Sequence, residues 1–363
     1  MKIAFYAPLK SPSHPVPSGD RLMARLLIEA MRRAGHIVFA ASELRSFTAA
    51  ADDPADADIR AAALEEIERL SALWQAQGAP DVWFAYHPYY KTPDLIGPAL
   101  CRRFGLAYVT AEASYSRRRN LGQWARAQAE VLEAVRLAAV NFCFTARDRQ
   151  GLEQVAPEAR FAALAPFLDT APFAAVTPHP RPGQLIAVAM MRPGDKMASF
   201  SMLADALDRI ADEDWTLSIV GDGKMRGELE RRFAGFGPER IRFHGERSAD
   251  EIVALLGDSA LYVWPGCGEA YGLAYLEAQA AGLPVVAQAT GGVPEVVRAG
   301  VTGLLTPEGD VAAYAAAVRR LLRDDALRRE MAGAARAFVL GERSLDRASG
   351  VIDDYLGKAM AGQ

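Results

Sequence analysis

The sequence has few cysteines and no long uninterrupted apolar stretch. Its 363 residues include only Cys101, Cys143 and Cys267, which are far apart and show no paired Cys/His spacing. This set excludes a disulfide framework and a zinc finger, and it fits a reducing compartment. The N-terminal apolar run ends at Pro8 and Pro12, too early for a signal peptide, and charges interrupt every longer run. We expect a cytoplasmic protein, with peripheral contact at the inner face of the membrane left open.

The sequence also has little net charge and no dinucleotide-binding fingerprint. Its 41 Lys and Arg residues and 45 Asp and Glu residues give a net charge of -4. The chain therefore lacks the excess of basic residues that is typical of nucleic-acid-binding proteins. The loop after Ala7 has no G-x-G-x-x-G, which argues against a nicotinamide dehydrogenase. The acidic run from 52 to 58 precedes a predicted helix, where carboxylates favour the helix dipole. We therefore interpret it as a helix start and not as a metal site.

What the sequence does have is a regular alternation of strand and helix patterns. The apolar runs of the first half predict strands at 2–7, 37–41, 82–86, 106–110 and 140–145, with helical patterns between them. After a proline-rich stretch the alternation resumes with strands at 185–190, 216–220, 241–243, 261–264 and 284–288. Such alternation is typical of parallel sheets with helices on both faces. The predicted fold class is α/β, with two doubly wound Rossmann-like domains whose parallel sheets face a central cleft.

Two glycine-rich loops lie between 265 and 295, each after a predicted strand. Ligands of doubly wound folds bind at the carboxyl ends of strands. Gly266, Gly268 and Gly272 let the backbone approach a ligand closely, and the helix predicted to begin near Tyr271 aims free N–H groups at the loop. The segment therefore predicts an anion-binding site.

A glutamate lies in an otherwise apolar helix of this segment. Glu277 follows Glu269 of the first glycine loop, and its helical neighbours are apolar nearly all round. A carboxylate buried there is costly unless hydrogen-bond donors meet it. Hydroxyls of a ribose or sugar would supply the donors; a structural carboxylate tied to backbone or arginine is the alternative. The paired glycine loops favour the ligand.

Basic residues follow the first predicted strand of the second half. Arg192 and Lys196 combine a planar fork and a point charge, which suit a diphosphate, although two basic residues in a loop are usually only solvated. The turn from Gly221 to Gly223 is a weak signal by itself. Pro294 and Glu295 fit a helix start.

Taken together, these motifs resemble the donor-binding half of family four retaining glycosyltransferases, which have the GT-B architecture. The resemblance is specific from about 185 to 340 and architectural before that. It rests on an E-x(7)-E signature, a Gly-Asp-Gly turn, a Phe-His-Gly strand end and a Gly-Gly-x-x-Glu turn, found at 269–277, 221–223, 243–245 and 291–295.

The resemblance implies roles for these residues. Glu269 would hold sugar hydroxyls, Glu277 the ribose, and Arg192 and Lys196 the leaving diphosphate. Further donor contacts would come from Gly221, Ala270, Tyr271, Gly272 and Leu273. Basic side chains and a helix N-terminus would then do the electrostatic work of a metal ion. We expect no metal and no cofactor, the nucleotide-sugar being a co-substrate.

The sequence departs from the family pattern in three places. Three residues separate Arg192 and Lys196, where the family usually has four. The family often has a histidine near 108–114; this chain has none, and Glu112 or Ser114 would take its place. The common Gly-Gly of the first loop is replaced by the sequence Ser-Gly-Asp at 18–20. There Gly19 would approach the donor phosphate and Asp20 would cap the next helix.

The acceptor side gives weaker signals. His87 stands at a predicted strand end, where contact with acceptor or donor and a structural role beside aromatics are both open. From Arg102 to Arg126 six arginines accompany one acid and several aromatics. Such a patch suits an anionic lipid surface or a phosphate-bearing acceptor; a solvated arginine face is the alternative.

The resemblance also assigns the predicted domains. We expect an acceptor-binding domain at 1–165, a linker at 166–183 where prolines crowd, a donor domain at 184–343, and a helix at 344–363 that crosses back to the first domain. The predicted function is transfer of a sugar from a nucleoside-diphosphate sugar, UDP-sugar favoured, to a glycan, glycolipid or lipid-linked acceptor. The alternatives are a nucleotide-sugar 2-epimerase of the same architecture and a non-catalytic two-lobed binding protein.

Overall fold

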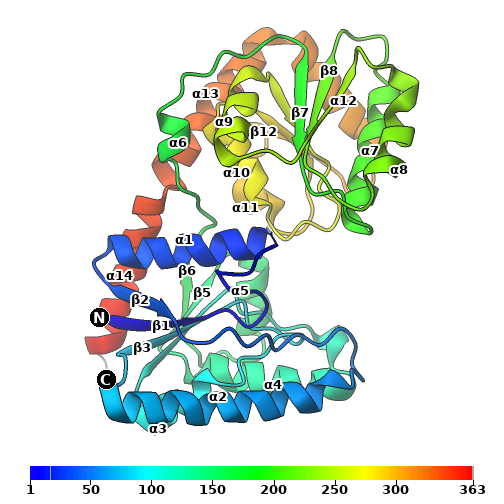
Figure 1. Ribbon diagram of the computed structural model, residues 1–363. Coiled ribbons are helices and arrows are strands. Elements are labelled where there is room, and N and C mark those ends of the chain that lie inside the picture. The colour runs from blue at the N-terminus through cyan, green and yellow to red at the C-terminus, as the bar shows by residue number, and fades with distance from the viewer. Residues whose placement is uncertain (17, 362–363) are drawn as a thin grey trace. The chain divides into compact units, whose positions relative to one another are not determined.

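The chain forms two compact α/β units. The computed structural model describes residues 1–16 and 18–361. Unit 1 combines residues 1–165 with the C-terminal segment from residue 345, and unit 2 comprises Pro166–Ser344 (Figure 1). In the described part of the chain, no helix is both long and apolar enough to span a bilayer.

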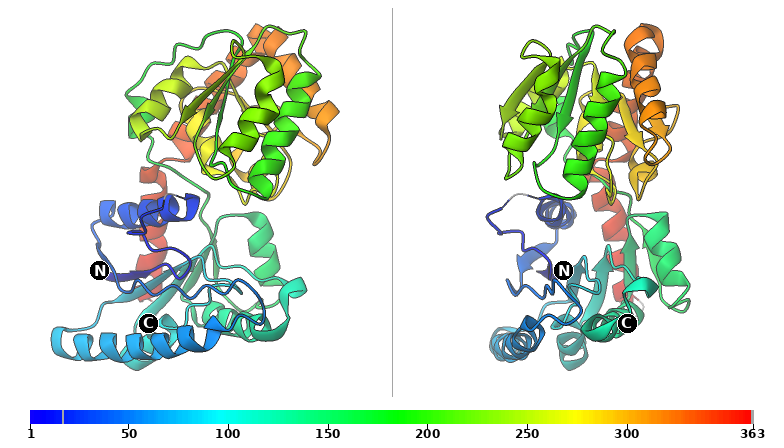
Figure 2. Two further views of the ribbon diagram at one scale, coloured as in Figure 1. Left: turned by 45° about the vertical axis from the view of Figure 1, so that its right-hand side comes forward. Right: turned by 90° about the vertical axis from the view of Figure 1, so that its right-hand side faces the viewer.

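Unit 1 is built on a six-stranded sheet in which all neighbouring strands are parallel, in the order β2-β1-β3-β4-β5-β6. The strands are β1 (Lys2–Tyr6), β2 (Ile37–Ala40), β3 (Val82–Tyr86), β4 (Ala107–Ala111), β5 (Val140–Cys143) and β6 (Phe161–Ala163). Every residue of β3 and β4 is buried, because helices cover both faces of the sheet (Figure 2). The strand order reverses between β1 and β3, and such a reversal opens a crevice at the carboxyl ends of the strands.

The helices of unit 1 connect these strands. They are α1 (Gly19–Arg33), α2 (Ala55–Gln77), α3 (Gly97–Phe104), η1 (Arg117–Arg119), α4 (Gly122–Leu137), α5 (Ala146–Glu153) and the C-terminal α14 (Leu345–Ala361). Helix α14 packs against α1, with Asp346 accepting a hydrogen bond of 2.7 Å from Arg33. On the opposite side of the sheet from α1 lie α2 and α3 (Figure 1).

Unit 2 repeats the design with the parallel sheet order β12-β11-β10-β7-β8-β9. Its strands are β7 (Gln184–Val188), β8 (Thr216–Val220), β9 (Ile241–Gly245), β10 (Leu261–Val263), β11 (Val285–Gln288) and β12 (Gly303–Thr306). Its helices are α6 (Ala171–Ala174), α7 (Asp195–Asp208), α8 (Arg226–Phe233), η2 (Ala234–Phe236), α9 (Ala249–Asp258), α10 (Leu273–Ala280), α11 (Val293–Val296), α12 (Val311–Arg323) and α13 (Asp325–Glu342). The order reverses between β7 and β10, so the loops after these two strands meet at a crevice.

The predicted fold class is confirmed: each unit is a doubly wound parallel sheet. Two short edge strands, β6 and β12, were not predicted, because half-buried residues interrupt their apolar pattern. The helix between β3 and β4 begins only at Gly97. The Asp94 carboxylate accepts hydrogen bonds from the backbone N–H groups of Ile96 and Gly97 at 3.0 and 2.8 Å, which holds the chain in a turn before the helix. Residues 166–183, expected as a linker, lie in unit 2, with Phe173 of α6 buried.

Candidate functional site

An ion pair occupies the crevice of unit 2. Lys196 lies in the first turn of α7, after the loop that follows β7, and its Nζ contacts Oε1 of Glu269 in the loop between β10 and α10. The indole Nε1 of Trp264 donates to the same carboxylate oxygen at 3.2 Å. The Lys196 ammonium also lies 5.4 Å from the centroid of the Trp264 ring. The structure thus brings two predicted site residues together at the place where doubly wound sheets bind ligands.

The first glycine loop is fixed against α7. The Ser199 hydroxyl accepts a hydrogen bond of 2.8 Å from the backbone N–H of Cys267 and donates one of 2.9 Å to the Asp195 carbonyl. Gly268 has φ +65°, and a Cβ at this position would overlap the Asp195 carboxylate. Any other residue would be strained there. The loop therefore holds Glu269 beside the positive N-terminal end of a fourteen-residue helix.

Glu277 is the second glutamate of the motif. Helix α10 begins at Leu273, two residues after Tyr271, because Gly272 has φ +78°, outside the helical range. The helix is largely buried, as its apolar sequence predicts, whereas Glu277 is half-buried. Burial raises the pKa of the Glu277 carboxyl. No side chain or backbone group among the described residues donates a hydrogen bond to it, so its oxygens are left for solvent or a ligand.

The two glycine loops of unit 2 pack on each other. The backbone N–H of Gly292 donates to the Ala270 carbonyl at 2.5 Å, and a Cβ on Gly291 would overlap the Glu269 carbonyl. Of the predicted backbone contacts, Ala270 is exposed, whereas Tyr271 and Leu273 are buried. Among these three residues, the backbone of Ala270 is therefore the most accessible to a ligand.

The remaining predicted donor residues lie on neighbouring loops. Arg192 is exposed and lies three residues before α7. Gly221 follows β8, where its N–H donates to the Gly245 carbonyl at 2.8 Å, and a Cβ on it would overlap the Ala189 carbonyl. Gly221 thus lets the loops after β7, β8 and β9 pack closely together.

A charged cluster occupies the crevice of unit 1. His87 follows β3, and its Nδ1 lies 3.2 Å from Oδ1 of Asp20 in the first turn of α1. The prediction that Asp20 caps α1 is wrong. Helix α1 begins at Gly19, and the Ser18 hydroxyl caps it by accepting a hydrogen bond of 3.2 Å from the Arg21 N–H. The Asp20 side chain is thereby available to His87.

Glu112 completes this cluster from the next strand. It follows β4, is 7% exposed, and, like His87, has a left-handed backbone, with φ of 58° and 60° respectively. Burial raises the pKa of Glu112 to about 7. Burial opposes protonation of His87, but the charges of Glu112 and Asp20 outweigh it and raise the pKa of His87 to about 9. Strained non-glycine residues of this kind collect at functional sites.

Two further predicted residues flank this cluster. The backbone N–H of Ser114 donates to the Pro88 carbonyl at 3.3 Å, which places Ser114 beside the residue after His87. Gly19 is exposed, and a Cβ on it would meet no atom within 4 Å of the surrounding structure. Packing within unit 1 therefore does not require a glycine at this position.

The six arginines predicted as one patch lie on three elements. Arg102 and Arg103 belong to α3 and pair with Glu133 and Glu68, the latter at 2.9 Å. Arg126 of α4 pairs with Glu130 at 3.2 Å. The other three form η1 and are exposed. Over the described ranges there is no group of three or more histidine, cysteine, aspartate or glutamate side chains placed to hold a metal ion.

Sequence comparison connects unit 2 with a known family. Residues 183–324 match the family model "Glycosyl transferases group 1". The sulfoquinovosyl transferase SQD2 of Arabidopsis thaliana is 33% identical over 141 residues, 38% of this chain and 27% of that protein. A phosphatidyl-myo-inositol mannosyltransferase of Mycobacterium leprae is 37% identical over 153 residues, 41% of this chain and 40% of that protein. The chain thus matches well under half of the length of these relatives.

Structural comparison covers both units. A sucrose-phosphate synthase from Thermosynechococcus elongatus has a TM-score of 0.78 and 18% identity, with 100% of both chains covered. The Anabaena protein HepE, solved in complex with UDP, has a TM-score of 0.73 and 18% identity, with 99% of this chain and 100% of that chain covered. At this identity the similarity shows a shared fold, the GT-B architecture.

Proposed function

Because residues 183–324 match the family model "Glycosyl transferases group 1", we propose that this chain is a retaining glycosyltransferase. It transfers a sugar from a nucleoside-diphosphate sugar, UDP-sugar favoured, to a glycan, glycolipid or lipid-linked acceptor. The observation that carries the proposal is the convergence of Lys196, Glu269 and the N-terminus of α7 at the crevice of unit 2, with the half-buried Glu277 on the helix that follows. A cation, helix N–H groups and carboxylates are what a diphosphate and a polyol require.

The diphosphate of the donor binds at Lys196, with Arg192 as the second cation. In the unliganded chain Glu269 neutralises Lys196, so a phosphate competes with this carboxylate for the ammonium group. Glu269 then accepts hydrogen bonds from sugar hydroxyls, and Trp264 keeps its carboxylate oriented. HepE, which shares the fold, binds UDP. That complex supports a uridine nucleotide as the donor group.

Ribose hydroxyls are the partners proposed for Glu277. The carboxylate is half-buried and receives no donor from the described residues, so two ribose hydroxyls offset its desolvation cost. The backbone of Ala270 to Leu273 supplies the remaining donor contacts. A structural carboxylate held by arginine or backbone would instead have its partner in the unliganded chain.

Bond cleavage places negative charge on the departing diphosphate. As the bond between the anomeric carbon and the phosphate oxygen breaks, the acceptor oxygen bonds to the same face of that carbon, and its proton passes to a departing phosphate oxygen. Lys196, Arg192 and the helix N-terminus stabilise this charge without a metal ion. Undiminished turnover in EDTA is the expected result, and loss of turnover that Mg²⁺ restores would contradict it.

The cluster in unit 1 provides the contacts to sugar or acceptor hydroxyls. Glu112 stands where family members often have a histidine, and its neighbour His87 offers an imidazolium. Ser114 adds a hydroxyl contact, whereas the backbone of the exposed Gly19 approaches the donor phosphate. A lipid-linked acceptor would further bring the enzyme to a membrane surface through the arginine-rich region of unit 1.

The test is nucleotide affinity in a matched pair of variants. Glu277→Ala is expected to abolish calorimetric binding of UDP while keeping the wild-type melting temperature. Glu330→Ala, which removes an exposed carboxylate from α13, is expected to bind as the wild type does. Unaltered affinity in Glu277→Ala would refute the ribose assignment. Products formed from a UDP-sugar without acceptor distinguish the transferase from an epimerase, and absence of any product with all acceptors would favour a binding protein.

A further inference from the structure

A surface of unit 1 carries five cations that pair with no carboxylate among the described residues of this unit. We call it the basic ridge and define it by Arg45, Lys91, Arg117, Arg118, Arg119 and Leu121. Its members come from the segment after β2, the turn after β3, η1 and the residue before α4. In the described part of unit 1, none of these five cations lies within 4.0 Å of a carboxylate oxygen, so the ridge keeps its charge.

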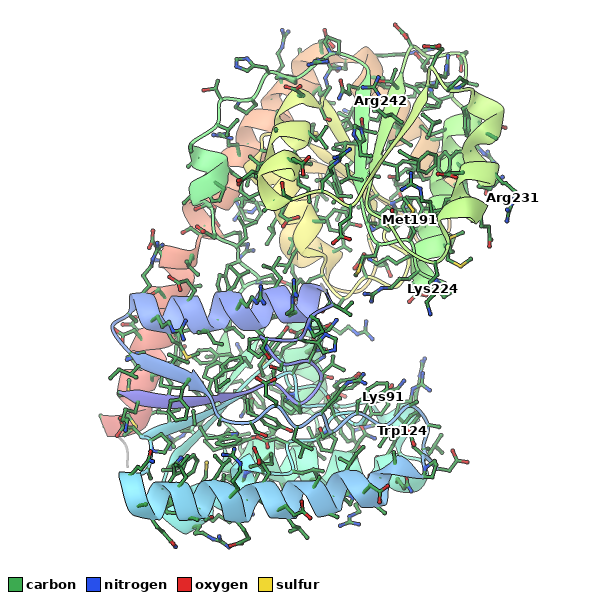
Figure 3. All side chains as sticks on the ribbon, viewed as in Figure 1. Lys91, Trp124, Met191, Lys224, Arg231 and Arg242 are labelled. Carbon is green, nitrogen blue, oxygen red and sulfur yellow. The ribbon has the colours of Figure 1, made fainter. Side chains whose placement is uncertain are left out.

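Aromatic rings hold three of these cations in place. The Arg45 guanidinium lies 4.3 Å from the centroid of the Phe47 ring. Lys91 lies 5.3 Å from the centroid of the Trp124 ring (Figure 3). Arg119 lies 5.9 Å from the centroid of the same ring. An aromatic face orders a cation without cancelling its charge, as a carboxylate would.

The rings themselves form a rigid platform. Trp124 is 7% exposed, and its Nε1 donates to the Thr48 hydroxyl at 3.1 Å. Tyr90 meets Trp124 edge to face with a centroid distance of 4.9 Å, and Arg119 also lies 5.9 Å from the Tyr90 ring. The cations of the ridge are therefore carried on a fixed base.

The other arginines of the predicted patch differ in this respect. Arg102, Arg103 and Arg126 each have a glutamate partner, so their charge is locally cancelled. The backbone N–H of Gln123 donates a hydrogen bond to the Ala51 carbonyl, so the acidic residues 52 and 53 lie near the ridge. The Asp53 carboxylate, however, accepts hydrogen bonds from the backbone N–H groups of Ala49 and Ala55.

An exposed apolar side chain completes the ridge. Leu121 is 57% exposed and lies two residues after η1, between the three consecutive arginines and α4. Cations around an exposed apolar residue match the headgroups and the acyl boundary of an anionic bilayer. A single-stranded nucleic acid would need free aromatic faces for base stacking, whereas the rings of Phe47 and Trp124 already carry cations.

We propose that the basic ridge docks this protein on a membrane surface rich in anionic phospholipids, with the arginines of η1 at the headgroups and Leu121 inserted below them. The proposal extends the proposed function, in which the acceptor is lipid-linked. It rests on that function only for the reason why the protein would dock on a membrane. Vesicle binding requires neither donor nor turnover, so the outcome of its test is separate from that of the transferase proposal.

The test is co-sedimentation with vesicles of mixed phosphatidylglycerol and phosphatidylcholine, compared with pure phosphatidylcholine. The double variant Arg117→Ser/Arg118→Ser removes two charges. At roughly five-fold in affinity per charge, it is expected to bind roughly 25-fold more weakly than the wild type. The control variant Arg102→Ser/Arg103→Ser has the same net charge as the first double variant. Its vesicle affinity is expected to stay within about two-fold of that of the wild type. Binding by the wild type is expected to fall with added salt.

Three outcomes would overturn the proposal. They are absence of wild-type binding to the anionic vesicles, equal binding to phosphatidylcholine alone, and equal losses in the two double variants. Competition by an oligonucleotide without any vesicle binding would show a nucleic-acid surface instead, and it also overturns the proposal. Both double variants need the wild-type melting temperature. If Arg117→Ser/Arg118→Ser melts below the wild type, Leu121→Ser decides the question, because it is expected to weaken vesicle binding without a change of charge.

Discussion

Nδ1 of His87 lies 3.2 Å from Oδ1 of Asp20, across the reversal in strand order of the first sheet. Lys196 and Glu269 meet at the equivalent reversal of the second sheet. In each unit one partner belongs to the first turn of the helix that follows the first strand of that unit. A basic and an acidic group thus mark both crevices, although the sequences around them differ.

The first prediction concerns the protonation of His87. Asp20→Asn removes one of the charges that raise its pKa to about 9, and the pKa is expected to fall measurably towards its usual value. The stabilisation that comes from the raised pKa is complete below the unfolded value of about 6.5 and is lost as the pH rises through about 9. The variant should therefore lose free energy of unfolding at pH 6 and little at pH 10. Histidine NMR titration and denaturation at both pH values test this, with Asp52→Asn as control. An unchanged His87 pKa would contradict the ion-pair assignment.

The second prediction concerns the cation in unit 2. Lys196→Ala is expected to weaken UDP binding by roughly 10- to 100-fold, the usual worth of a charge-assisted hydrogen bond. Arg231→Ala, an exposed cation on α8, removes the same charge at a site that Figure 3 shows on the outer side of unit 2 and should bind normally. Calorimetry measures both. Equal affinities would mean that Lys196 serves only to neutralise Glu269.

The sequence predicted which candidate residues lie together better in unit 2 than in unit 1, for a physical reason. Glu269 and Glu277 share one loop–helix segment, so local spacing fixes their relation, and Lys196 follows the neighbouring strand. The electrostatic interaction of His87 with Glu112 instead depends on β3 and β4 being neighbours and on two left-handed residues, which no local pattern indicates. Ser18 and Asp20 both suit an N-cap, so only the observed hydrogen bond tells them apart.

The predicted arginine patch shows a related limit. Proximity in sequence placed Arg103 with the arginines of η1, but its partner Glu68 comes from α2, thirty-five residues earlier. Whether a cation is neutralised depends on such distant partners. The edge strands β6 and β12 were not predicted for another reason: short strands with partly exposed residues lack a continuous apolar run.

The third prediction concerns the glycine loop. Gly268→Ala places a Cβ against the Asp195 carboxylate at φ +65°, whereas Gly309→Ala has φ +75° in open space. The control, Gly309→Ala, should lose about 1–2 kcal/mol in the free energy of unfolding, which is the cost of placing alanine in a left-handed backbone conformation. Gly268→Ala should lose more, and UDP affinity should fall as well because the loop carries Glu269. Denaturant unfolding and calorimetry separate the two effects. Equal stabilities would show that Asp195 moves aside freely.

The fourth prediction concerns Glu112, whose carboxyl titrates near neutrality because burial raises its pKa to about 7. If this group contacts a reacting sugar or acceptor, the rate of transfer changes across pH 6 to 8 as the carboxyl loses its proton. Glu112→Gln keeps the shape but cannot titrate, so the limb near pH 7 should disappear and the rate at the optimum should fall by roughly ten-fold or more. UDP affinity should stay unchanged, because the proposed diphosphate site lies in unit 2. Initial rates from pH 5.5 to 9 test this, with Glu43→Gln as an exposed control. A retained limb near pH 7 would assign it to another group, and a loss of UDP affinity would mean that Glu112 supports the donor.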